Sequence, residues 1–80
     1  MIQPVTIRIR DLGLAAALVS CGHDIRGTSR DINGRFYFIF HDGSDLGRDT
    51  RAYWADTLQV KARKFFDNTK MLKARIYADE

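Results

Sequence analysis

The chain contains little sulfur and no long apolar run. Cys21 is the only cysteine among 80 residues, so no internal disulfide can form, and we expect a reducing, cytoplasmic location. The longest apolar run, Leu14 to Val19, is far too short to cross a bilayer. The segment Met1 to Arg10 alternates and carries arginines where a signal peptide needs an apolar core. We therefore predict neither secretion nor a membrane partner.

The sequence also lacks the motifs of common catalytic and metal sites. It has no CxxC pair, no G-x-S-x-G elbow and no Gly-rich phosphate loop. Some possible metal ligands lie near the ends of predicted strands, namely Cys21, His23, His41, Asp42 and Asp45. Their spacing matches no four-ligand pattern, and the aspartates lie in polar segments that offer no site for acid–base chemistry. We predict no metal, no cofactor and no enzymatic activity.

Length and charge set further limits. Five phenylalanines, three tyrosines and one tryptophan in 80 residues supply one modest core, so we predict a single domain over residues 1–80. The formal net charge of +3 permits nucleic acid or an acidic protein as a partner without requiring either. The charge is uneven, because residues 61–75 hold six basic residues and one acidic residue, whereas residues 41–56 hold four aspartates and two arginines.

The clearest structural signal is the segment Arg35 to Asp42. Its phenylalanines recur at every second position, and Tyr37 and Ile39 fall between them, which is the period of a β-strand. The preceding dipeptide Asn33-Gly34 favours a two-residue type I′ hairpin turn, so we predict a partner strand within residues 23–30.

That turn predicts a register for the two strands. The facing pairs would be Arg30 with Tyr37, Thr28 with Ile39, and Arg26 with His41. The phenylalanine face carries the larger apolar load, so we expect helices to cover it and the tyrosine face to stay open. A one-residue bulge would invert part of this assignment.

Four further elements are predicted around this hairpin. Residues 5–10 alternate as a strand, and Asp11 is a helix cap before a short, buried helix that ends at Gly22. A second short helix follows a cap at Gly43-Ser44 and runs toward Trp54, although Gly47 weakens it. A long helix spans Val60 to Tyr77, with an apolar stripe expected to rest on the sheet and formed by Ala62, Phe65, Phe66, Thr69, Leu72 and Ile76.

Together these elements predict an α+β fold. A right-handed crossover from the first strand to the second leaves a gap that the third strand fills. The expected architecture is a three-stranded antiparallel-type sheet of order 1-3-2, a split β-α-β unit plus a hairpin, with one face covered by two to three helices.

Several motifs resemble a known family. They are Asp11-Leu12-x-Leu14-Ala15-Ala16-x-Leu18 with Gly22, Gly34-Arg35-Phe36-x-Phe38-x-Phe40, Val60-x-Ala62-Arg63-x-Phe65, and Leu72-Lys73-x-Arg75 before Tyr77. The chain is similar to a family of short uncharacterised proteins from bacteria and phages, known only as a domain of unknown function. The resemblance implies a small stand-alone protein carried by a phage or a mobile element. It supplies no catalytic residues.

A candidate binding surface lies on the open side of the predicted sheet. Guanidinium groups bind phosphates and stack on bases, and an exposed tyrosine offers a platform for a base. The candidate residues are Arg8, Arg10, Arg26, Arg30, Arg35 and Tyr37, with a secondary basic patch at Lys61, Lys64, Lys70 and Arg75. We predict a non-enzymatic binding module for nucleic acid or a nucleoprotein complex. The alternative is that these side chains form an ordinary solvated surface.

A protein partner is the second functional hypothesis. Tyr and Arg anchor many protein interfaces, and an edge strand at residues 5–10 or 23–30 could pair with a partner's sheet or with its own copy as a homodimer. A small phage protein of this kind could inhibit a host complex, for example as an anti-CRISPR-type protein. Exposure of Tyr53 and Trp54 beside the acidic segment would favour this hypothesis.

Overall fold

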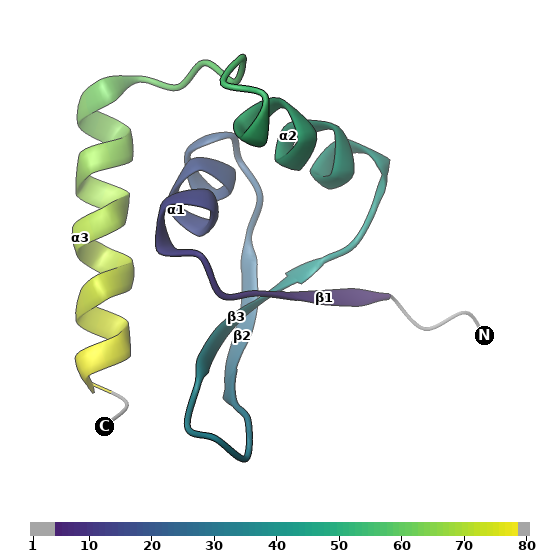
Figure 1. Cartoon of the computed structure of the whole chain (residues 1–80). Coiled ribbons are helices and arrows are strands. Elements are labelled where there is room, and N and C mark those ends of the chain that lie inside the picture. The colour runs from purple at the N-terminus through teal and green to yellow at the C-terminus, as the bar shows by residue number, and fades with distance from the viewer. Residues whose placement is uncertain (1–4, 79–80) are drawn as a thin grey trace.

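The computed structural model describes residues 5–78. Its elements follow one another as β1 (Thr6–Ile9), α1 (Leu12–Ser20), β2 (Ile25–Arg30), β3 (Phe36–His41), α2 (Ser44–Trp54) and α3 (Ala62–Ala78). The strands form one antiparallel sheet of order β1-β3-β2, and the helices pack beside it (Figure 1). The predicted α+β class and strand order are confirmed. None of the helices within residues 5–78 has the length and apolarity needed to cross a bilayer.

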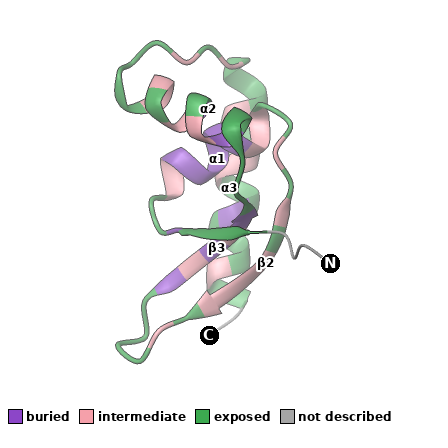
Figure 2. Cartoon of the chain, turned by 90° about the vertical axis from the view of Figure 1, so that its right-hand side faces the viewer, coloured by how far each residue is buried: buried purple, intermediate pink, exposed green. Residues whose placement is uncertain are grey.

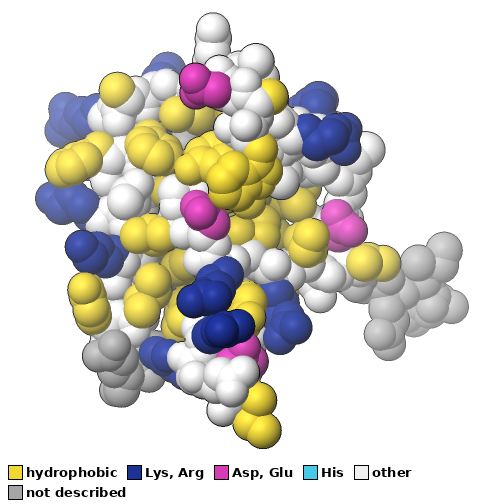
Figure 3. Space-filling view, viewed as in Figure 1, with side chains coloured by type: hydrophobic (Ala, Val, Ile, Leu, Met, Phe, Trp, Pro, Cys, Tyr) yellow, Lys and Arg dark blue, Asp and Glu magenta, His cyan; other side chains and the backbone are white. Residues whose placement is uncertain are grey.

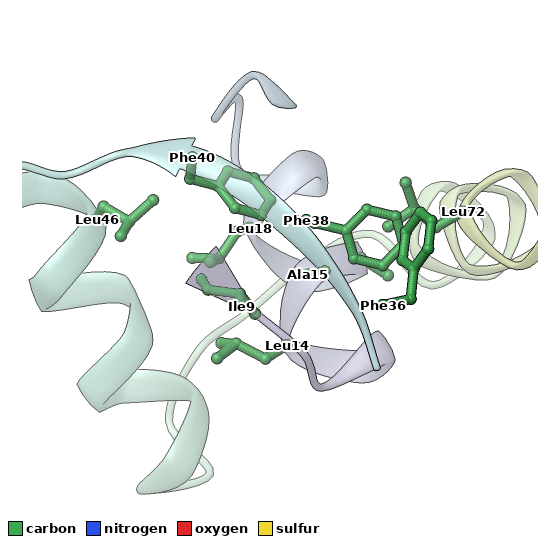
Figure 4. Close-up of a cluster of buried hydrophobic side chains, with 10 residues drawn as sticks. Ile9, Leu14, Ala15, Leu18, Phe36, Phe38, Phe40, Leu46 and Leu72 are labelled. Carbon is green, nitrogen blue, oxygen red and sulfur yellow. The ribbon is translucent and has the colours of Figure 1, made fainter. Parts of the chain in front are cut away.

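The core lies between the phenylalanine face of β3 and the helices. Phe38 and Phe40 are fully buried, and the Phe36 and Phe38 rings meet edge to face with 5.1 Å between their centroids. Each helix sends a leucine to this cluster, as Figure 4 shows for Leu18 of α1, Leu46 of α2 and Leu72 of α3. The expected orientation of β3 is therefore confirmed, because the phenylalanines face the helices.

Helix α1 packs closely against α3, and its buried side includes a run of small residues. Its three consecutive alanines, Ala15 to Ala17, are almost completely buried. The helix begins as predicted, since the Asp11 Oδ1 atom accepts a hydrogen bond from the Leu14 backbone N–H at 2.9 Å. It ends before Gly22, whose φ of +97° is in the left-handed region that glycine tolerates.

Helix α2 is held against α1 by a close approach of an aromatic side chain to a glycine. Leu46 enters the core, and the Tyr53 hydroxyl lies 2.5 Å from the position that a Cβ on Gly13 would take. A side chain at position 13 would therefore force the Tyr53 hydroxyl to move. The cap predicted at Gly43-Ser44 is partly wrong, because Gly43 is the cap residue, Ser44 is the first helical residue, and no side chain bonds the free N–H groups there.

Helix α3 packs mainly against α1 and reaches the sheet through Leu72, beside Phe36 and Phe38, so only part of its predicted apolar stripe rests on the sheet (Figure 4). Phe65, Leu72 and Ile76 join or border the core. The Asn68 amide donates a hydrogen bond of 3.0 Å to the Ser20 hydroxyl and so fixes the two helices to each other. Phe66, which was assigned to the buried stripe, is 61% exposed. The buried apolar stripe of α3 is therefore narrower than the one predicted from the sequence.

The β2–β3 hairpin has a longer loop than predicted. The Asp31 N–H donates to the Arg35 carbonyl and the Gly34 N–H donates to the Asp31 carbonyl, both at 3.0 Å. Residues 32–34 therefore form a three-residue loop, in which Gly34 has a φ of +81°. A type I turn followed by a left-handed glycine has this pattern, so the predicted two-residue turn is wrong.

The longer loop shifts β2 by one residue and exchanges its faces. Arg30 lies opposite Phe36, Thr28 opposite Phe38, and Ser29 opposite Tyr37. Arg30 and Thr28 are therefore on the phenylalanine side, contrary to the prediction. A second irregularity lies between Ile25 and Gly27, so Arg26 has no direct partner in β3. The shift was possible because β2 has few apolar side chains of its own to fix its orientation.

Candidate nucleic-acid interface on the open sheet face

The sheet side away from the helices is called the open face here. Strand pairing places Arg8 beside Ile39 and Ser29 beside Tyr37 on this side. The full set of strand residues that it carries is Thr6, Arg8, Gly27, Ser29, Tyr37, Ile39 and His41. Tyr37 and Ile39 are half-buried by their neighbours in the sheet and do not join the buried core. This side of β3 was predicted to be exposed, and the structure shows it only partly exposed.

Tyr37 lies at the centre of the open face and is held by two contacts. The Arg8 guanidinium carbon is 4.8 Å from the centroid of the Tyr37 ring, a cation–π distance. The Tyr37 hydroxyl donates a hydrogen bond of 3.1 Å to the Asp31 carboxylate. Tyr37 is therefore a fixed support for Arg8, and its ring is not the free platform expected from the sequence.

Asp31 organises the hairpin loop by accepting hydrogen bonds at both of its carboxylate oxygens. Its Oδ1 atom accepts the backbone N–H groups of Asn33 at 2.9 Å and Arg35 at 3.0 Å. The Arg35 N–H, followed by the N–H of Asn33 and the Tyr37 hydroxyl, holds the pKa of the Asp31 carboxyl below its usual value. The carboxylate therefore stays ionised while its oxygens are occupied by loop and tyrosine donors.

The predicted arginines divide between the two sides of the sheet. Arg8 is on the open face. Arg10 follows β1, Arg35 precedes β3, and both residues are exposed. Arg30 is not on this face, because its guanidinium lies 5.2 Å from the Phe36 ring centroid and donates to the Gly34 carbonyl at 2.8 Å. Arg26 occupies the irregular position in β2. The structure thus brings Arg8 and Tyr37 into contact, with Arg10 one residue after β1 and Arg35 one residue before β3.

The secondary basic residues do not form one patch. Lys64 and Arg75 lie on the same side of α3, because eleven residues at 100° each return almost to the starting direction. Lys70 lies roughly 120° away by the same rule, and its ammonium group is 5.4 Å from the exposed Phe66 ring. Lys61 precedes the helix. Figure 3 shows Lys and Arg side chains along the α3 side of the molecule and over the lower part of the sheet.

A side-chain contact between His23 and Asp49 was not predicted from the sequence. The His23 Nε2 atom lies 2.8 Å from the Asp49 carboxylate, which joins the start of β2 to α2. This contact with His23, supported by Arg48, lowers the pKa of Asp49 even though burial opposes ionisation. Burial and the nearby Asp49 charge raise the pKa of the Cys21 thiol. Within residues 5–78, no three His, Cys, Asp or Glu side chains are placed to hold a metal ion.

A separate hollow, lined by both apolar and polar groups, lies where α1, α2 and α3 meet. It has a volume of about 320 Å³ and is lined by Ala17, Tyr53, Asp56, Leu58, Val60 and Phe65. Trp54 stands beside it, 62% exposed, with its ring 5.0 Å from the Tyr53 ring in an edge-to-face arrangement. Burial and the Asp11 carboxylate raise the pKa of Tyr53. Figure 3 shows hydrophobic side chains gathered on this part of the surface.

Comparison with known proteins gives a family without a function. The family described as Domain of unknown function (DUF5659) matches residues 4–78, which is nearly the whole chain. No curated protein and no solved structure matches the sequence. Function must therefore be inferred from the surfaces described above.

Proposed function

Because the chain belongs to the DUF5659 family of unknown function, we propose its role from its surfaces: it is a non-enzymatic module that holds single-stranded nucleic acid on its open face. The nucleic acid is either free or part of a nucleoprotein complex. A small phage or mobile-element protein acting in the cytoplasm fits this role. The lone thiol of Cys21 is compatible with that reducing location.

The observation that carries the proposal is the Arg8–Tyr37 contact, with Arg10 and Arg35 exposed nearby. Bases stack on guanidinium planes as well as on aromatic rings, and a guanidinium also forms paired hydrogen bonds with a phosphate. Tyr37 restricts the motion of Arg8, so less side-chain entropy is lost when Arg8 binds. Arg10 and Arg35 supply further positive charge for the backbone of the strand.

Asp31 supports the same proposal by holding Tyr37, the ring on which the Arg8 guanidinium lies. Contacts to phosphate carry no sequence information. We therefore expect binding that depends steeply on salt and weakly on sequence.

The experiment is a fluorescence-anisotropy titration of labelled oligothymidylate at several salt concentrations. Arg8→Ala should weaken binding about tenfold, the scale of one lost charged contact, and should reduce the salt slope by about 0.7 for each lost phosphate contact. Arg51→Ala, which removes an exposed arginine from α2, is the matched control and should bind like the wild type. Absence of binding by the wild type, or an unchanged affinity in Arg8→Ala, would refute the proposal.

The second candidate function is docking on a host protein, as an inhibitor of a host complex would. The exposed Trp54, whose ring contacts Tyr53 at the edge of a hollow, favours it, since tryptophan is enriched among residues that dominate binding energy. A pull-down from nuclease-treated lysate separates the two candidates. Protein docking predicts a partner that survives nuclease and is lost in Trp54→Ala, whereas nucleic-acid binding predicts that nuclease removes the captured material.

A further inference from the structure

Strand β1 is an edge strand with apolar side chains left in solvent. Within residues 5–78 it pairs with β3 on one side and with no strand on the other. Ile7 faces the helix side opposite Phe40, yet it remains 39% exposed, and Val5 is 65% exposed. Figure 2 shows most of β1 as exposed surface. Edge strands of this kind pair readily with another strand.

The hydrogen bonds to β3 define which backbone groups are available on the free edge. The Val5 carbonyl accepts the Asp42 N–H at 2.8 Å, so Val5, Ile7 and Ile9 direct their backbone groups toward β3. The alternate residues, Thr6 and Arg8, therefore direct their N–H and C=O groups away from β3. Both residues present one donor and one acceptor to an incoming strand.

We propose that the occupant of this edge is a second copy of the chain, paired antiparallel through β1 about a two-fold axis at Ile7. In this arrangement, Thr6 exchanges backbone hydrogen bonds with the partner's Arg8, and Arg8 does so with the partner's Thr6. Ile7 lies against the partner's Ile7. The two three-stranded sheets become one six-stranded sheet.

Three conditions favour this register over its neighbours. A two-fold axis normal to the sheet keeps the helix side of one copy next to the helix side of the other. Shifting the pairing of the two β1 strands by one residue would therefore place apolar side chains opposite polar ones. An axis at Arg8 would bring two guanidinium groups face to face, which is unfavourable. An axis at Thr6 would leave Ile9 of β1 without an opposite strand residue. The Ile7 axis satisfies the hydrogen bonds, joins the exposed apolar side chains and places each Arg8 opposite a threonine.

The dimer would also join the two open faces into one surface. Each copy would place its Arg8–Tyr37 pair on the same side of the combined sheet, next to the joint. If the proposed function is right, a longer single strand could then cross both copies. This consequence rests on the proposed function, but the dimer itself does not.

Light scattering coupled to size-exclusion chromatography tests the dimer without nucleic acid. The wild type should move from the mass of one chain, 9.2 kDa, toward twice that mass as concentration rises. Thr6→Pro removes an N–H that points away from β3, so it should keep the fold and remain a monomer. Thr6→Val retains the N–H and should still dimerise. A wild type that stays monomeric at all concentrations would overturn the proposal.

Cross-linking tests the register and does not depend on the proline variant. Residues that face each other without mutual hydrogen bonds have Cα atoms about 4.5 Å apart, within the range that a disulfide spans. In a Cys21→Ala background, Ile7→Cys should therefore oxidise to a covalent dimer. Val5→Cys should not, because Val5 would face the partner's Ile9. Equal cross-linking of both variants would contradict the proposed axis, and loss of nucleic-acid binding alone would leave this result unaffected.

Discussion

Strands β1 and β2 flank the same central strand, but only β1 has a sequence that determines which side faces the core. Ile7 and Ile9 alternate with polar residues. They pair with Phe40 and Phe38 of β3 and face the same side of the sheet as these phenylalanines, as predicted. In β2, Ile25 is the only large apolar residue, so loop geometry sets the orientation of the strand. Hydrophobic alternation fixes a register where it is strong, and turn geometry fixes it where alternation is weak.

The largest expected effect on stability comes from comparing a side chain on each side of β3, the central strand that pairs with both β1 and β2. Phe38→Ala should lower the free energy of unfolding by about 3 to 5 kcal/mol, because it empties a fully buried site. Ile39→Ala, on the open face, should cost clearly less. Urea denaturation followed by circular dichroism measures both changes. Equal losses would mean that the two sides of β3 are equally buried.

The His23–Asp49 contact just before β2 should have the next largest effect. Asp49→Asn removes the charge that meets His23 at 2.8 Å and should cost about 1 to 3 kcal/mol at neutral pH. The pKa of Asp49 is lowered in the folded protein, so this stabilisation is present above the unfolded pKa of about 3.9 and is lost as pH falls through the lower folded pKa.

Measuring the unfolding free energy as a function of pH tests whether stability falls on acidification as expected. The wild type should lose stability on acidification in that range, and Asp49→Asn should lose less there. Parallel pH curves for the two proteins would show that the Asp49 carboxylate does not stabilise the junction of β2 and α2 through His23.

The loop that sets the β2 register gives a third test. Gly34→Ala places a side chain at a φ of +81° and should cost about 1 to 2 kcal/mol. Gly27→Ala, in β2 itself, has ordinary backbone angles and no atom within 4 Å of the new Cβ, so it should be neutral or slightly stabilising. Thermal unfolding of the two variants distinguishes them. If Gly34→Ala left the thermal unfolding unchanged, Gly34 would not need the left-handed conformation in this loop.

The smallest effect concerns a buried hydroxyl in β2. The Ser29 Oγ atom is buried and has no hydrogen-bond partner among residues 5–78. Ser29→Ala removes an unsatisfied polar group and should raise the unfolding free energy by about 1 kcal/mol. Thr6→Ala in the exposed part of β1 provides a comparison and should not stabilise the protein. Destabilisation by Ser29→Ala would show that the hydroxyl does have a partner.

The fold was largely predictable because its main signals are local. The alternating phenylalanines fixed the central strand, Asp11 marked a helix start, and the apolar helix around Ala16 had to be buried. The loop length was not predictable in the same way. The Asn33-Gly34 dipeptide suits both a two-residue turn and the last part of a three-residue loop, so one extra loop residue, Ile32, was enough to change the register.

The candidate site was predictable only where it depended on β1 and β3. Arg8 and Tyr37 were assigned to the same side, although their direct contact was not foreseen. Arg30 was misassigned because its side depended on the hairpin register. The His23–Asp49 pair joins residues 26 positions apart, and no pattern in the sequence connects them.

The most direct test of the account is the alignment of β2 with β3, because it decides which arginines share the open face. Nuclear Overhauser effects between cross-strand Hα protons report it, since these protons are close only at non-hydrogen-bonded pairs. The structure predicts strong Hα–Hα signals between Arg30 and Phe36 and between Thr28 and Phe38. Signals from Asp31 to Phe36 and from Ser29 to Phe38 would instead return Arg30 to the open face and contradict the three-residue loop and the register that it sets.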